Sequence, residues 1–495
     1  MAEATLDIKR FFAALGKPRS LAGAPRLQSE TEGAETEGEE PSPDPDLMAG
    51  LATLFCNVAP VGGRLPGGRV HELLLGIDRC ISAQLNEILH DPGFQAVESA
   101  WRSLDGLIAA SNFRAQVRLD LLDVSKEELY DDLEAGSVDV TETSPFRKLY
   151  LEEYDQFGGE PYGAMIGLYE FGNTPQDILW LRQMSKVAAM SHAPFIGSVS
   201  PRFFGFETAE QVSAARDLEG LLRHPRYGAW HALRAAPEAG YLGLVMPRYL
   251  VRTPWNPDLM DPAELPEFPF VEDVGRDGRG YLWGSAAMLF ARNMVRAFEH
   301  SGWCQTIRGQ HGGGLVSELP SHRFWVGNER VLKSPVEVAI PDWAELSFAN
   351  AGFIPLLERP GTDEACFFSC QSVLAPRRYR NEVDTERSQL QSNLAYTLSA
   401  SRIAHYLKCI VRDVVGSTAD ESYLQALLKG WLEGYVTTIE SPDDRTLLFY
   451  PFKGARVVVE KAEGVVGKYN CLVGVSPHIQ FEGIDVELRL ESRIG

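Results

Sequence analysis

The chain has 495 residues, of which 44% are hydrophobic and 10% aromatic, so it is long enough for several domains and can fill a large core. Its 68 acidic residues against 47 Lys and Arg give a net charge of −21, which argues against broad contact with nucleic acid or an anionic membrane. The first 30 residues lack the apolar core of a signal peptide, no apolar run of about 18 residues occurs, and the seven cysteines are scattered. We therefore expect a cytosolic protein with reduced thiols and no membrane insertion, whose partners are proteins.

The N-terminal tail, residues 1–29, has a net charge of +3 and precedes an acidic stretch, residues 30–46, with eight acidic residues and no basic one. Such a stretch has almost nothing to bury, so we expect a disordered linker. Within the tail, apolar residues share one face of about two and a half helical turns: Leu6, Ile8, Phe11, Phe12 and Leu15. A helix this short is marginal in water, so it either packs on its own domain or orders against a partner, and the linker favours the partner.

Residues 47–112 predict a helical segment that packs toward the C-terminal domain. Two apolar stripes at helical spacing are separated by Asp91-Pro92, where Asp can cap a helix and Pro suits its first turn. The first stripe is formed by Ile77, Ile81, Leu85, Ile88 and Leu89, and the second by Phe94, Val97, Trp101, Leu104 and Ile108. We expect the second stripe to pack in the core.

The central region, residues 113–385, alternates short apolar runs with helical stretches and therefore predicts an α/β layered domain. Buried strands are predicted within 162–171, 193–199 and 241–252, and helices at 177–190 and 285–302. The Gly-rich stretch 309–314 lacks the Lys-Ser/Thr of a nucleotide-binding loop, so we interpret it as a tight structural turn.

The C-terminal region, residues 386–495, begins with helices predicted at about 386–415 and 420–436 and ends in segments whose apolar residues alternate at period two. In the last segment four apolar residues share one face: Ile484, Val486, Leu488 and Leu490. This pattern predicts a half-buried antiparallel β meander whose last strand lies at an edge. An open edge can accept a strand from another chain, so these four residues are the candidates for an inter-protomer strand. The whole chain is thus expected to be a mixed α+β and α/β protein.

Signals of enzyme chemistry are weak. The sequence has no GxxxxGK[ST], HExxH or GxSxG motif and no GxGxxG between a strand and a helix. Cys366 and Cys370 have no neighbouring Cys or His pair to complete a zinc site, so we expect core cysteines, and we expect His405 and His478 to be core or interface histidines. We therefore predict no catalytic residue, no cofactor and no metal, and a subunit of an assembly rather than an enzyme.

Many segments, taken in order, resemble the large sheath subunit of the bacterial type VI secretion system, the TssC/VipB family. The segments that carry the resemblance are ISAQLNEILHDPGFQAVESAWRSL (81–104), YDQFGGEP (154–161), MSHAPFIGSV (190–199), YLGLVMPRYLVRTPW (241–255), YLWGSAAMLF (281–290), GWCQTIRGQHGGGLVSELP (302–320), PVEVAIPDWAELSFANAGFIPL (335–356), RIAHYLKCIVRDVVGS (402–417) and KYNCLVGVSPHIQFEG (468–483). So many ordered matches are far more specific than a single motif. Ser103 stands where the family has a glycine, which we interpret as a packing variant, and the first 46 residues match poorly.

The resemblance implies a contractile tail-sheath-like protomer. In this family the large subunit pairs with a small sheath subunit (TssB/VipA-like), and the heterodimers form a six-start helical sheath around an inner tube protein (Hcp-like) on a baseplate. The sheath lies in the bacterial cytoplasm as part of an envelope-anchored assembly, and its contraction propels the tube in type VI protein secretion. Neighbouring protomers are joined by exchanged strands, with the large subunit's C-terminal sheet as the acceptor.

The resemblance also implies that a ClpV-type AAA+ ATPase recognises a helix near the N-terminus and disassembles contracted sheaths. Leu6, Ile8, Phe11, Phe12 and Leu15 are the candidate recognition residues. Two alternatives stay open at this point: a sheath-like protein of a phage tail or extracellular contractile injection system, and a soluble acidic hydrolase. An ATPase-accessible helix argues against the first alternative, because a single-use sheath needs no recycling.

Overall fold

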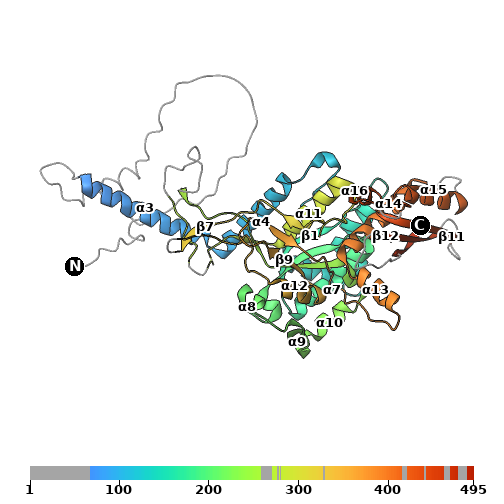
Figure 1. Ribbon diagram of the computed structural model, residues 1–495, viewed down its shortest axis with the longest axis horizontal. Coiled ribbons are helices and arrows are strands. Elements are labelled where there is room, and N and C mark those ends of the chain that lie inside the picture. The colour runs from blue at the N-terminus through green and yellow to red at the C-terminus, as the bar shows by residue number, and fades with distance from the viewer. Residues whose placement is uncertain are drawn as a thin grey trace, which may run out of the picture. The chain divides into compact units, whose positions relative to one another are not determined.

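The computed structural model describes residues 67–257, 270–275, 278, 280–326, 329–414, 421–439, 442–461, 469–477 and 488–494 (Figure 1). The predicted tail helix and acidic linker lie outside the described residues. The chain forms two compact units, Met1–Phe94 with Trp255–Gly275 and Gln95–Pro254 with Arg276–Gly495.

The described part of the first unit is built around helix α3 (Gly67–Leu89), and helix α4 (Pro92–Ala109) begins at its C-terminal end. The break between the helices falls at the predicted Asp91-Pro92, where the Asp91 carboxylate accepts a hydrogen bond from the Phe94 amide at 3.0 Å. The segment 270–275 is tied to the last turns of α3, because the Asp273 amide donates to Asn86 Oδ1 at 2.9 Å.

The second unit contains a six-stranded sheet in the order β1-β2-β3-β9-β10-β6. Neighbouring strands are parallel from β1 to β9 and antiparallel from β9 to β6. The strands are β1 (Met165–Phe171), β2 (Phe195–Val199), β3 (Leu242–Met246), β9 (Ile354–Glu358), β10 (Ala365–Phe367) and β6 (Leu315–Val316). Since β1, β2 and β3 fall within the three predicted runs and helices separate them, the α/β layering is confirmed.

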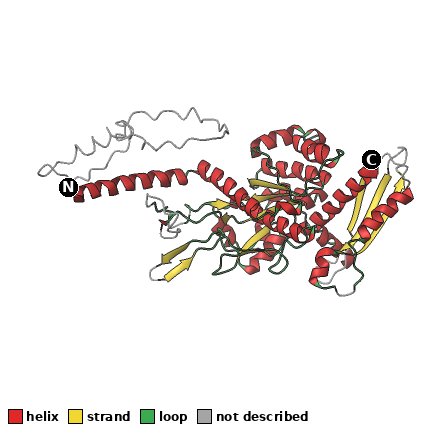
Figure 2. Cartoon of the chain, turned by 90° about the horizontal axis from the view of Figure 1, so that it is seen from above, coloured by secondary structure: helices red, strands yellow, loops and turns green. Residues whose placement is uncertain are grey.

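Helices cover both faces of this sheet (Figure 2). Because consecutive residues of a strand point to opposite faces, each strand contributes side chains to two cores. Phe195 and Leu244 belong to a core shared with helix α7 (Pro175–Ser191), whereas Ile196 and Val245 belong to a core shared with α11 (Ala286–Ser301). Both helices were predicted, and α11 ends at Gly302, which adopts a left-handed conformation with φ 76°.

Shorter elements complete the central part of the second unit. The helices and turns are η1 (Phe113–Ala115), α5 (Lys126–Ala135), η2 (Val140–Glu142), α6 (Ser144–Phe146), the π-helix η3 (Arg147–Tyr154), η4 (Pro201–Phe204), α8 (Ala209–Ser213), α9 (Leu218–Leu222), η5 (Pro225–Tyr227), α10 (Gly228–Arg234), η6 (Pro237–Tyr241) and α12 (Asp342–Asn350). Two small antiparallel pairs are β4 (Tyr249–Leu250) with β5 (Trp283–Gly284) and β7 (Arg323–Val326) with β8 (Glu329–Leu332). The stretch 309–314 is a structural turn, as predicted, since the Gly309 amide donates to the Phe367 carbonyl at 2.8 Å.

A long helix, α14 (Leu394–Val414), joins the central sheet to the C-terminal elements. Its first turns, with Leu394 and Leu398, pack in the core of the central sheet, while Ile403 and Leu407 pack in a separate C-terminal core. The other C-terminal elements are α13 (Glu382–Gln391), α15 (Glu421–Glu433), α16 (Asp444–Phe449), β11 (Phe452–Lys461), β12 (Tyr469–Pro477) and β13 (Leu488–Ile494).

The stripe on α4 that we expected to pack in the core is largely exposed. The side chains of Val97 and Trp101 are 59% and 61% exposed, and among the five stripe residues only Leu104 is partly buried. The helix instead buries Ser103 and Leu107, and Leu107 packs in a small cluster with residues of α11. The helix itself was predicted, but the expected core packing of Phe94, Val97, Trp101 and Ile108 is wrong. Helical spacing of apolar residues predicts an apolar face, but it does not identify what covers that face.

Candidate strand-exchange interface

The predicted C-terminal meander is an antiparallel three-stranded sheet in the order β11-β12-β13. β11 and β12 pair from Phe452 opposite Pro477 to Lys461 opposite Tyr469. β12 and β13 pair from Val475 opposite Leu488 to Tyr469 opposite Ile494. β12 is therefore the middle strand, and β11 and β13 each have an outer side that does not face β12.

One face of this sheet is buried and the other is exposed. The buried side chains on β11 and β12 include Val457, Val459, Cys471, Val473 and Val475, each at most 7% exposed. They pack in the C-terminal core with leucines of α15 and with residues of α14. Leu472, which follows Cys471, is 39% exposed on the other face. This alternation is the period-two pattern from which the half-buried sheet was predicted.

The structure locates only part of the predicted inter-protomer strand. Leu488 and Leu490 lie in β13, opposite Val475 and Val473 of β12, so they occupy the register positions of buried residues. Ile484 and Val486 lie outside the described residues, as do all five ATPase-recognition candidates: Leu6, Ile8, Phe11, Phe12 and Leu15.

An aromatic cluster around Trp303 fixes the sheet to the rest of the unit. The Trp303 side chain is 3% exposed, and its ring centroid lies 5.5 Å from Phe452 at the start of β11 and 5.2 Å from Tyr435. Tyr406 of α14 lies 6.5 Å away. Sequence reasoning missed this anchor, because its members lie far apart along the chain and belong to no local period. Their shared aromatic character is the one signal that the sequence offers.

The buried His405 and the partly buried His192 lie where α7, η3 and α14 meet. His405 Nε2 lies 3.0 Å from the Ser191 carbonyl, His192 Nδ1 lies 3.1 Å from the Tyr241 hydroxyl, and the two ring centroids are 6.3 Å apart. Burial lowers the pKa of His405 to about 3 and that of His192 to about 4. Both are therefore neutral at pH 7, and His405 is a core histidine as predicted. His478 lies outside the described residues.

The thiols of Cys366, on β10, and Cys370, just after it, are packed in the protein interior. Cys366 and Cys370 are 4% and 1% exposed, and burial raises the pKa of the Cys366 thiol to about 11 and that of Cys370 to about 12. Protonated, inaccessible thiols are poor nucleophiles and poor metal ligands, so both are core cysteines as predicted. Among the described residues, no three His, Cys, Asp or Glu side chains gather in a group that could hold a metal ion. No helix of the described chain is long and apolar enough to cross a membrane.

Comparison with known proteins gives two adjoining family matches and one curated relative. Residues 71–374 match the family domain described as "EvpB/VC_A0108, tail sheath N-terminal domain", and residues 383–494 match "EvpB/VC_A0108, tail sheath gpW/gp25-like domain". The chain is also 39% identical over 429 residues to the type VI secretion system sheath protein TssC1 of Pseudomonas aeruginosa, covering 86% of each chain. The second match contains all described residues of the three-stranded sheet.

Proposed function

The chain belongs to the EvpB/VC_A0108 tail sheath family, and from this premise we propose how it works as a structural subunit of a type VI secretion sheath. The family is one of sheath structural proteins, so the chain is not an enzyme and the acidic hydrolase is set aside. The observation that carries the proposal is the pair of sheath-domain matches, which together extend from residue 71 to residue 494.

We propose that the chain pairs with a small, TssB/VipA-like sheath subunit in the bacterial cytoplasm. The heterodimers would assemble as a six-start helix around an Hcp-like inner tube on a baseplate anchored to the envelope. Pairs of large apolar side chains that lie exposed one turn apart on helices of the second unit support this view, since contiguous exposed apolar surface marks sites of protein interaction. Besides Val97 and Trp101 on α4, they include Trp343 and Leu346 on α12, which are 59% and 64% exposed.

The C-terminal sheet is the proposed acceptor of strands from neighbouring protomers. Backbone pairing at a sheet edge holds two chains together without specifying a rigid side-chain interface, so it tolerates rotation of the protomers during contraction. α14 supports this role, because it packs in both cores and can transmit movement of the sheet to the central domain.

Co-expression with the small sheath subunit tests this proposal. We expect a stable heterodimer after affinity purification, and tubes with a six-fold end view in negative-stain micrographs. Absence of both the heterodimer and the tubes, with the chain itself folded, would contradict the proposed function. A tube that contracts but is insensitive to a ClpV-type ATPase would instead indicate a single-use phage-tail or extracellular sheath.

We further propose that the N-terminal segment is the recognition site of that ATPase. The test is the affinity of a peptide of residues 1–20 for the ATPase N-terminal domain, with Phe11→Ala and Phe12→Ala as the disruptive changes and Lys17→Ala as the control. We expect the two Phe substitutions to abolish binding, because they remove the largest apolar side chains of the segment. Unchanged affinity after both Phe substitutions would refute this proposal.

A further inference from the structure

The outer side of β11 presents backbone amides that β12 does not use. Val459 and Lys461 lie opposite Cys471 and Tyr469 of β12. The amides of Val459 and Lys461 point away from β12, as their hydrogen bonds to acceptors on the other side show. In an antiparallel ladder, opposed residues that share no hydrogen bond, such as Val459 and Cys471, alternate with opposed residues that exchange two hydrogen bonds. Outward amides on an outer strand are a template for a strand of another chain.

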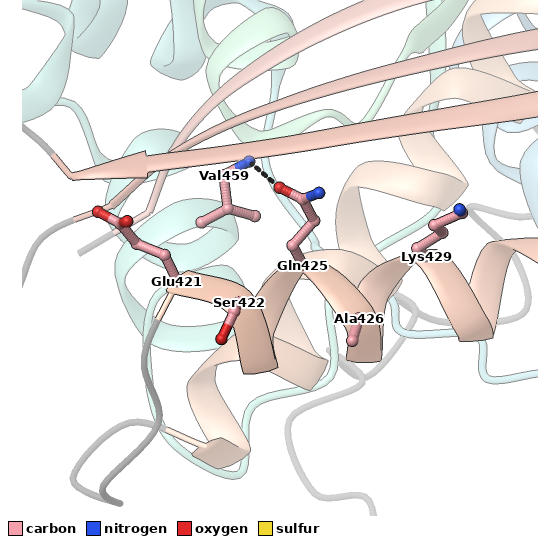
Figure 3. Close-up of a pocket in the computed structure, with 6 residues that line it drawn as sticks. All are labelled: Glu421, Ser422, Gln425, Ala426, Lys429 and Val459. Carbon is pink, nitrogen blue, oxygen red and sulfur yellow. Dashed lines mark hydrogen bonds between the residues drawn. The ribbon is translucent and has the colours of Figure 1, made fainter.

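Helix α15 supplies the acceptors for these two amides through its side chains, and Figure 3 shows the bond between Gln425 and the Val459 amide. Gln425 Oε1 accepts from the Val459 amide at 3.4 Å, and Glu421 Oε1 accepts from the Lys461 amide at 3.2 Å. The Glu421 carboxylate also lies 3.8 Å from Lys461 Nζ. Four residues along a helix rise about 6 Å and two along a strand about 6.6–6.8 Å. The spacing of Glu421 and Gln425 therefore matches that of alternate strand amides.

The same outer side is closed at its other end by backbone. The Phe452 carbonyl accepts from the Thr437 amide at 2.9 Å, and the Phe452 amide donates to the Tyr435 carbonyl at 3.3 Å. α15 itself is firmly seated, since three of its four leucines are at most 4% exposed in the C-terminal core: Leu424, Leu428 and Leu432. A strand that paired with β11 would have to displace a packed helix.

We propose that Glu421 and Gln425 form an edge cover, a pair of side chains that occupies two outer amides of β11, those of Val459 and Lys461, and prevents β11 from pairing with the sheet of a second copy of this chain. The inference rests on the proposed function in one respect: with β11 closed, strand exchange is left to the outer side of β13, with which no strand of the described chain pairs. The edge cover thereby permits strand exchange at β13 and prevents free protomers from associating edge to edge through β11.

Hydrogen exchange of the free, full-length chain tests the edge cover with residue resolution. Gln425 is exposed on α15, so Gln425→Ala leaves the leucine contacts intact and is expected to accelerate exchange of the Val459 amide about fivefold without affecting Lys461. Glu421→Ala should do the reverse, and Glu421→Gln should restore protection because an amide oxygen still accepts. Lys429→Ala is the matched control, since Lys429 lines a small pocket together with Glu421 and Gln425 (Figure 3) but pairs with Glu433.

Self-association gives the functional readout. We expect the double variant Glu421→Ala/Gln425→Ala to form larger species with rising concentration in sedimentation velocity, while the wild type and Lys429→Ala do not. Unchanged exchange at Val459 and Lys461 together with unchanged sedimentation would overturn the edge cover, and so would an equal effect of Lys429→Ala. These measurements need no sheath, so they stand apart from the proposed function.

A substitution on β13 tests the direction of strand exchange. The amides of Cys471 and Val473 face β13, so the register places the Glu491 amide on the outer side of β13. Glu491→Pro removes that donor without removing a bond to β12, whereas Glu491→Ala keeps it. With the small subunit present, we expect Glu491→Pro to abolish tubes but keep the heterodimer, and Glu491→Ala to form tubes. Normal tubes from Glu491→Pro would contradict exchange at β13.

Discussion

Ser103 shows how one side chain connects two elements of the second unit. Its hydroxyl accepts a hydrogen bond from the Tyr249 hydroxyl at 3.0 Å, and the two residues are 3% and 6% exposed. The structure thus gives this hydroxyl a specific contact between α4 and β4. A buried hydroxyl that loses its partner retains the cost of leaving water.

We predict that Ser103→Ala lowers the free energy of unfolding by about 1–3 kcal/mol, because the Tyr249 hydroxyl is left buried without that partner. Urea denaturation followed by tryptophan fluorescence measures the change. Tyr249→Phe removes the other hydroxyl, and the double variant should lose less stability than the sum of the two single variants. Strict additivity would mean that the hydrogen bond makes no contribution.

His192 and His405 make the stability of the chain depend on pH. The folded chain holds the pKa of His192 at about 4 and that of His405 at about 3, against 6.5 without burial. Between about pH 4 and 6.5 the unfolded chain binds protons that the folded chain does not. The free energy of unfolding therefore has its full value above about pH 6.5. It falls as the pH decreases through that window, by about 1.4 kcal/mol per pH unit for each histidine.

We expect the urea midpoint to decrease between about pH 7.5 and about pH 5, and to decrease less in His405→Phe, which removes one of the two titrating groups. The exposed His311 provides the control, since His311→Gln should keep the full dependence. Identical slopes for the wild type and His405→Phe would show that His405 does not contribute.

At the scale of elements, a tryptophan on α4 and a tryptophan on α7 show how burial determines the stability lost when an aromatic side chain is removed. Trp101 of α4 is 61% exposed, whereas Trp180 of α7 is 1% exposed and packs against Phe171 and Phe195. We predict that Trp180→Ala costs about 3–5 kcal/mol of stability and that Trp101→Ala costs the free chain less than about 1 kcal/mol. Thermal and urea denaturation of the two variants measure the difference. A comparable loss in both would mean that the α4 stripe is covered in the free chain.

The sequence predicted elements better than contacts, for physical reasons that differ between elements. The C-terminal sheet was predictable because Val457 and Val459, or Val473 and Val475, alternate with residues of the other face, and a period of two belongs to strands alone. The break at Asp91-Pro92 was predictable because capping is local. The cover of β11 was not, since Glu421 and Gln425 reach amides that lie on another element, and no short-range pattern records such a pairing.

At the scale of the whole molecule, charge sets the conditions for assembly. The chain carries a net charge of −21, to which residues 30–46 contribute −8 and the tail, residues 1–29, contributes +3, leaving −16 on residues 47–495. Copies packed side by side would repel, so we expect the small subunit or the inner tube to present compensating positive surface.

We therefore predict that sheath assembly with these partners weakens as salt rises from about 50 mM to about 500 mM, because attraction between opposite charges is screened. The fraction of protein in sedimentable tubes measures this effect. Assembly that strengthens steadily with salt would show that repulsion between like-charged copies dominates.

The central claim is that the C-terminal sheet of each protomer is completed by a strand from a neighbour. A cryo-electron microscopy reconstruction of the sheath formed with the small subunit tests it most directly. The account predicts an additional strand paired to the outer side of β13, with α15 still seated against β11. A sheath in which no neighbouring chain pairs with this sheet, or in which the added strand lies on β11 in place of α15, would contradict it.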